Sequence, residues 1–130
     1  MSNPYRPAAE FRAELRRFLR RSEDCARSHG LTPRQHLLLL QIAGTDDGIG
    51  RVSDLVGRLS LTQSAVTELV QRAEEAGLVQ RSPSPHDGRV VDLRLTPEGE
   101  RRLASVHEEL GPEREHLHRA LEALDAGRRS

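Results

Sequence analysis

The stretch that decides the fold runs from Arg51 to Thr96 and reads RVSDLVGRLSLTQSAVTELVQRAEEAGLVQRSPSPHDGRVVDLRLT. Its first half contains two short helical patterns, which Ser53 and Thr62 can cap. Each pattern turns an apolar stripe inward: Val52, Leu55, Val56 and Leu59 in the first helix, and Val66, Leu69, Val70 and Ala73 in the second. A break of about three residues between two such helices is the spacing of a helix-turn-helix, whose second helix enters the DNA major groove.

The second of these helices has a polar face opposite its apolar stripe. Short polar side chains on such a face can reach the edges of base pairs. We therefore expect DNA contacts from Thr62, Gln63, Ser64, Thr67, Glu68, Gln71 and Arg72. Two interpretations of Glu68 stay open, because its carboxylate can accept a hydrogen bond from a cytosine amino group or can pair with Arg72, four residues further on.

The second half of the stretch changes from helical to alternating periodicity. The glycine of Ala76-Gly77 ends the second helix. Residues 78–81 and 90–95 then have the pattern of two strands, the second alternating apolar and polar side chains. Two prolines and a glycine stiffen and turn the loop 82–89 between them. We expect this hairpin to project as a wing, with Arg89 near its far end.

With these features the chain resembles the MarR family of bacterial transcriptional regulators. The resemblance covers about residues 31 to 110 and rests on three segments: EEAGLVQR after the helix pair, Asp87-Gly88-Arg89 in the wing, and VVDLRLTPEGERRL after the wing. It implies a mainly α fold with a small antiparallel β wing, in which Arg51-Val52 joins the wing strands as a third strand. It also implies that Arg89 reaches the minor groove and that Asp87 helps to hold the wing.

The resemblance further implies a homodimer that binds a palindromic operator in double-stranded DNA. Repression in the family is relieved by a small molecule, often an aromatic or anionic effector. Two positions depart from the family, which often has an arginine where Gly88 and Glu68 stand. Both departures reduce the positive charge at the face that would meet DNA.

The flanking segments have the pattern of dimerisation helices around a central DNA-binding region at residues 31–96 of a single domain, 1–130. Helical periodicity covers residues 8–30 and 97–125, and Gly111-Pro112 should interrupt the second of these segments. The apolar residues expected at the dimer interface are Phe11, Leu15, Leu117, Leu121 and Leu124. The segment from Leu37 to Ile42 is apolar on nearly every side, which predicts a buried central helix.

Composition limits the classes of function. The 130 residues include 20 basic side chains, all arginine, and 20 acidic ones, so the formal charge is zero and indiscriminate binding of polyanions is disfavoured. One cysteine excludes an internal disulfide, and no membrane-length apolar run is present. We expect a cytoplasmic protein that does not bind membranes.

The sequence favours no catalytic or metal site. No group of Ser, His and Asp suggests a nucleophile, and the spacing of a calcium loop is absent from residues 45–50. His116 and His118 face different sides of a helix, so we predict no metal site there or at His107. His36 is more typical of a surface or core residue than of a ligand pocket, and Cys25 lacks a second cysteine for redox sensing. The remaining alternative to DNA binding is a winged-helix module that binds another protein.

Overall fold

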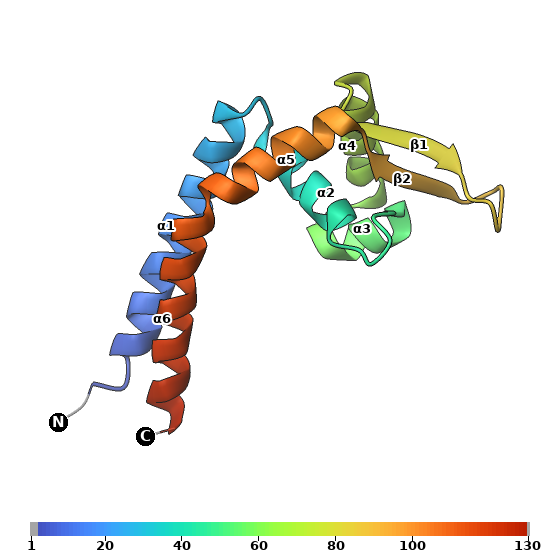
Figure 1. Ribbon diagram of the computed structural model, residues 1–130. Helices are drawn as coiled ribbons and strands as arrows, with labels where there is room; N and C mark the ends of the chain where they lie inside the picture. The colour runs from blue at the N-terminus through green and yellow to red at the C-terminus, as the bar shows by residue number, and fades with distance from the viewer. Residues whose placement is uncertain (1–2, 130) are drawn as a thin grey trace.

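The computed structural model describes residues 3–129. This part of the chain forms six helices and one pair of strands (Figure 1). In chain order they are α1 (Arg6–Ser28), α2 (Pro33–Ala43), α3 (Val52–Leu59), α4 (Gln63–Glu75), β1 (Val79–Pro83), β2 (Val91–Leu95), α5 (Pro97–Glu109) and α6 (Gly111–Arg129). The predicted fold class, mainly α with a small antiparallel wing, is confirmed.

The molecule is bent and has two parts joined by α5 (Figure 1). Helices α1 and α6 lie side by side in opposite directions and form an arm, whose free end carries both ends of the described chain. The other part contains α2, α3 and α4, and the β1–β2 hairpin projects from it. Among the helices just given, none combines the length and apolar character that a membrane span requires.

Helix α2 lies at the centre of the contacts, since it packs against α1, α3, α4, α5 and β2. Its buried face carries Leu38, Leu39 and Ile42, each 0% exposed. The prediction that the whole apolar segment is buried is wrong, because Leu37 is 45% and Leu40 is 38% exposed. A helix can turn only part of its circumference toward neighbours in so small a domain, and none of the described elements covers the remaining face of α2.

The predicted cap at Thr62 is present, and side chains also cap α2 and α5. The Thr62 side chain accepts a hydrogen bond from the Ala65 N–H, and Thr96 accepts one from the Gly99 N–H. Thr32 and Gln35 form the reciprocal capping box that opens α2. The expected cap at Ser53 is wrong, because α3 begins two residues earlier than such a cap requires, with Arg51 at the N-cap position and no side-chain cap hydrogen bond.

The wing hairpin pairs Val79 with Leu95 at its base and Pro83 with Val91 near its tip. The family's third strand at Arg51-Val52 is reduced to a single bridge between Gly50 and Leu93, because Val52 already begins α3. The predicted alternation in the second strand also fails. Asp92 is only 2% exposed, whereas Val91 is 40% exposed.

The long C-terminal pattern is broken where the sequence predicted it. Leu110 is the C-cap residue of α5, and α6 begins at Gly111. The break turns the chain so that α6 runs back along α1 (Figure 1). Helix α6 of the same chain therefore covers part of the apolar stripe of α1.

Candidate nucleic-acid interface

Helix α4 is held by its apolar stripe and presents its opposite face to solvent. Val66 and Ala73 are fully buried, and Val70 is 2% exposed. Thr62, Gln63, Ser64, Thr67, Glu68, Gln71 and Arg72 are all exposed. The turn before α4 includes Ser60 at φ 54°, in the left-handed region, which sets the angle between α3 and α4.

Two pairs of side chains on the exposed face of α4 bind each other along the helix. The Glu68 Oε1 atom lies 2.7 Å from Arg72 Nη2, and both side chains are largely exposed. Gln71 Nε2 donates to Glu75 Oε1 at 3.5 Å. Of the two interpretations of Glu68, the intrahelical ion pair is therefore present. Gln63, Ser64 and Thr67 make no side-chain hydrogen bond to any residue of the described chain, 3–129, so their polar atoms are free for another molecule.

The tip of the wing is organised by Asp87. Its Oδ1 accepts a hydrogen bond from the Arg89 N–H at 3.1 Å and lies 3.4 Å from Arg89 Nε. The Val90 N–H donates to the Asp87 carbonyl, and the Ser84 N–H donates to the Val90 carbonyl, which closes the hairpin. The Arg89 side chain is 93% exposed. The wing thus holds an arginine in solvent at a defined place on the backbone.

Most other arginines near this face are partly neutralised. Arg81 pairs with Glu74 at 2.9 Å, and Arg51 pairs with the buried Asp92 at 3.4 Å. Arg58 is exposed and makes no ion pair with any residue in the described range. Positive potential on this surface is therefore local, which agrees with the zero formal charge of the chain.

One residue that the sequence interpretation did not include lies beside α4. Arg34, in the first turn of α2, lines a cavity of about 260 Å³ together with Arg72 and Glu68. The sequence signal was available, because Arg34 follows a proline at a helix N-terminus, a position that favours anions. Glu68 lines the same cavity and pairs with Arg72, so Arg34 is the arginine there without an ion pair to a residue of the described chain.

Two titratable groups lie in the core, away from this surface. His36 is 5% exposed, and its burial, assisted by the nearby His107, lowers its pKa below the ordinary value. Cys25 is 6% exposed, and burial together with the hydrogen bond to Glu109 raises the pKa of its thiol to about 12. The chain has no second cysteine to form a disulfide with an oxidised Cys25, so the sequence argument against a redox role stands.

A helix pair joined by a left-handed turn, a polar outer face on the second helix and a projecting two-stranded hairpin define a winged helix-turn-helix protein. Comparison with known proteins agrees. The MarR family matches residues 29–90. The HTH-type transcriptional repressor MdtR of Bacillus subtilis is 35% identical over 77 residues, which make up 59% of this chain and 48% of MdtR. The chain thus spans about half the length of that relative.

Two solved structures have the same architecture. The YusO protein from Bacillus subtilis is 28% identical, with a TM-score of 0.62 over 85% of this chain and 75% of that one. A mutant MarR from E. coli, crystallised with operator DNA, is 23% identical, with a TM-score of 0.68 over 82% of this chain and 75% of that one. The chain is thus similar to MarR-family proteins in sequence over residues 29–90 and has the winged-helix fold of the solved structures.

Proposed function

We propose that this protein is a transcriptional regulator that binds double-stranded DNA as a homodimer at a palindromic operator. The observation that carries the proposal is the pairing of a free polar face on α4 with a wing that holds Arg89 93% exposed. The polar face suits base edges in the major groove, and an extended arginine suits the adjacent minor groove or its phosphates. Operator DNA bound to the E. coli relative supports this assignment.

The homodimer part of the proposal rests on apolar surface that the single chain leaves open on its arm. Leu19 of α1 is 51% exposed and Leu121 of α6 is 49% exposed. Leu15 and Leu19 also line a shallow cavity of about 510 Å³ along α1, edged by arginines. A second copy related by a two-fold axis would cover both helices and would place two α4 helices about one DNA turn, or roughly 34 Å, apart.

A repressor whose DNA binding is relieved by a small aromatic or anionic effector is the form of regulation that similarity to MarR-family proteins favours. An anion could use the arginines that edge the arm, where Arg12, Arg16 and Arg20 surround the apolar floor of the α1 cavity. Its binding there would compete with or reshape the dimer contact and would change the spacing of the two α4 helices.

The experiment that tests DNA binding uses the segment immediately upstream of the protein's own coding region in a shift assay at several salt concentrations. Each phosphate contact adds about 0.9 to the slope of log K against log salt. Arg89→Ala should weaken binding and lower the slope by about one unit for each subunit bound. Arg119→Ala is the matched control, because it removes the same charge from an exposed position on α6 in the arm. A thermal unfolding scan should show no loss of stability in either variant.

A winged-helix module that binds another protein is the competing function. The zero formal charge, Glu68 and Gly88 favour it. The same assay separates the two functions: DNA affinity that is weak, independent of salt and equal in Arg89→Ala and wild type would reject DNA binding and leave the protein-binding module.

A further inference from the structure

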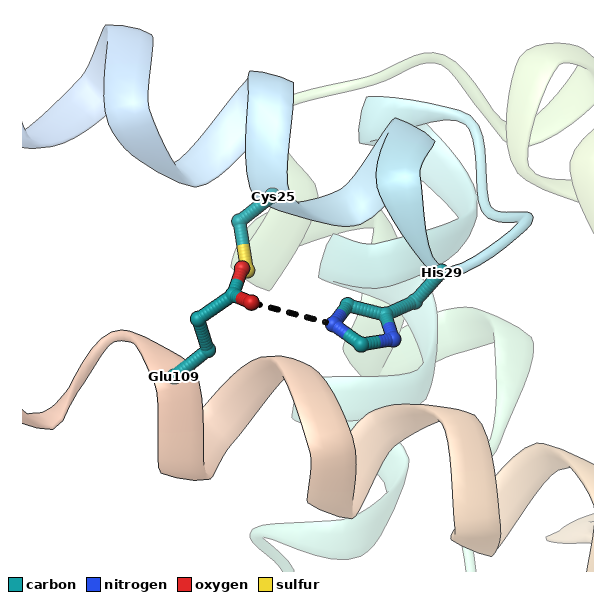
Figure 2. A group of neighbouring side chains, drawn as sticks. All are labelled: Cys25, His29 and Glu109. Atoms are coloured by element: carbon teal, nitrogen blue, oxygen red, sulfur yellow. Dashed lines mark hydrogen bonds and ion pairs between the residues drawn. The ribbon is translucent and has the colours of Figure 1, made fainter.

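Three side chains with different metal-binding chemistry meet where the arm joins the DNA-binding part (Figure 2). Cys25 and His29 are four residues apart near the end of α1, so they share one helix face. Glu109, the last residue of α5, reaches toward both from the opposite side (Figure 2). One ligand atom from each residue lies within 4.8 Å of the other two.

The hydrogen bonds of this cluster leave one group unsatisfied. Glu109 Oε2 accepts a hydrogen bond from Cys25 Sγ at 2.7 Å. His29 Nε2 lies 3.6 Å from Glu109 Oε1, too far for a hydrogen bond, and it is a buried atom without a hydrogen-bond partner. A buried polar atom without a partner is costly and needs an explanation. Figure 2 marks the contact with Glu109 as an ion pair, and it shows the imidazole nitrogen and the carboxylate facing the same space, where both could bind one metal ion.

The separations suit a tetrahedral metal ion. Zinc bonds of about 2.0–2.3 Å to sulfur, nitrogen and oxygen put neighbouring ligand atoms about 3.3–3.6 Å apart. The 3.6 Å between His29 Nε2 and Glu109 Oε1 is already close to that spacing. The contact between Cys25 Sγ and Glu109 must lengthen, and the Glu109 side chain, 58% exposed, is free to make that movement. The thiol proton would leave to solvent as the metal–sulfur bond forms.

We propose that Cys25, His29 and Glu109 form a zinc site that ties the end of α1 to the end of α5. A thiolate, an imidazole and a carboxylate together select zinc over magnesium or calcium, which take oxygen ligands. With three protein ligands, the fourth position is open to water. Two of the three ligands, Cys25 and Glu109, also line a cavity of about 320 Å³, together with Arg21, Asp24 and Glu113.

The location gives such an ion a mechanical consequence. Glu109 immediately precedes the break between α5 and α6, and His29 immediately follows α1. Both ends belong to the joint between the arm and the DNA-binding part (Figure 1). Zinc would therefore fix the angle at this joint. The metal site stands independently of the proposed DNA binding, since it is tested without DNA.

The test uses the full chain without a histidine tag, reduced and freed of metal with a chelator. Cobalt(II) is added first, because a cobalt–thiolate bond produces a charge-transfer absorption, and zinc is then added to displace it. We expect one equivalent of cobalt per chain and complete displacement by zinc. Zinc should also raise the midpoint of thermal unfolding, because a ligand that binds the folded state stabilises it.

Variants assign the ligands. Cys25→Ser should abolish the absorption, and His29→Gln and Glu109→Gln should each weaken binding by roughly tenfold or more. Glu108→Gln, one residue away and exposed, is the matched control and should bind cobalt like wild type. If Cys25→Ser does not fold, Glu109→Gln still tests the metal site. The Glu109 side chain is largely exposed, so this variant should fold. Wild type without the absorption, or an absorption that His29→Gln and Glu109→Gln leave unchanged, would overturn the proposal.

Discussion

Replacing Glu68 with glutamine separates the two roles open to this residue at the centre of the polar face of α4. Its carboxylate binds Arg72 at 2.7 Å, with the two side chains 63% and 71% exposed. An exposed pair four residues apart on a helix contributes only about 0.3–0.5 kcal/mol. Glu68→Gln should therefore lower the thermal midpoint by no more than about 1–2 °C in a chain of this size.

The effect on DNA should be larger than the effect on folding. Glu68→Gln releases Arg72 and removes a negative charge beside the phosphates, so nonspecific binding should strengthen and its salt slope should steepen by about one unit per subunit. If Glu68 also accepts a hydrogen bond from cytosine, the preference at one base pair of each half-site should relax by about 1–3 kcal/mol, or roughly 5- to 150-fold. To accept a hydrogen bond from cytosine, Glu68 must give up its ion pair with Arg72. The expected loss of base preference therefore lies toward the lower end of that range.

Selection of binding sites from random DNA, followed by salt titration on one selected site and one unrelated duplex, measures both effects. Glu100→Gln is the matched control, because it removes the same charge from an exposed side chain in the first turn of α5 that pairs with no residue of the described chain. Identical selected motifs for Glu68→Gln and wild type would remove Glu68 from the set of base-reading residues. An unchanged salt slope as well would refute the inference that Arg72 is held away from DNA by its partner.

Three further predictions concern the core and the arm. Asp92→Ala should destabilise the fold by about 1–3 kcal/mol in urea unfolding, since it removes the buried partner of Arg51 beside the Gly50–Leu93 bridge; a neutral result would show that this pair is dispensable. Because the pKa of His36 is lowered in the folded protein, the unfolded state binds more protons as the pH falls. The free energy of unfolding should therefore be highest above the ordinary histidine pKa and should decrease as the pH drops through the pKa of folded His36. His36→Leu should flatten this dependence, and an unchanged pH profile would contradict it. Leu121→Glu should give a monomer by light scattering. Ala123→Glu, about 200° around α6, should leave the dimer intact. If both variants remain dimers, Leu121 does not belong to the interface.

Local chemistry explains why much of the fold could be predicted from the sequence. Thr62 and Thr96 cap helices through N–H groups three residues away, and a glycine at φ 74° ends the α4 segment at Gly77. The inward stripes of α3 and α4 follow helical periodicity, which needs no knowledge of distant residues. The break at Gly111-Pro112 is equally local, because Pro112 has no N–H to continue the hydrogen bonds of α5 and is tolerated only in the first turn of a helix. The wing could be predicted from the change from helical to alternating periodicity and from the turn residues of its loop.

Tertiary structure alone decided the features that depend on which distant segments meet. Leu37 and Leu40 were expected to be buried, but no element within residues 3–129 covers their side of α2. Asp92 looked like an outward polar residue of an alternating strand, yet the approach of Arg51 and the bridge at Gly50 bury it. The spacing of Cys25 and His29 was visible in the sequence, but their partner Glu109 lies 84 residues beyond Cys25. Periodicity and capping act within a few residues, whereas burial and clusters of ligands depend on long-range packing that short patterns do not specify.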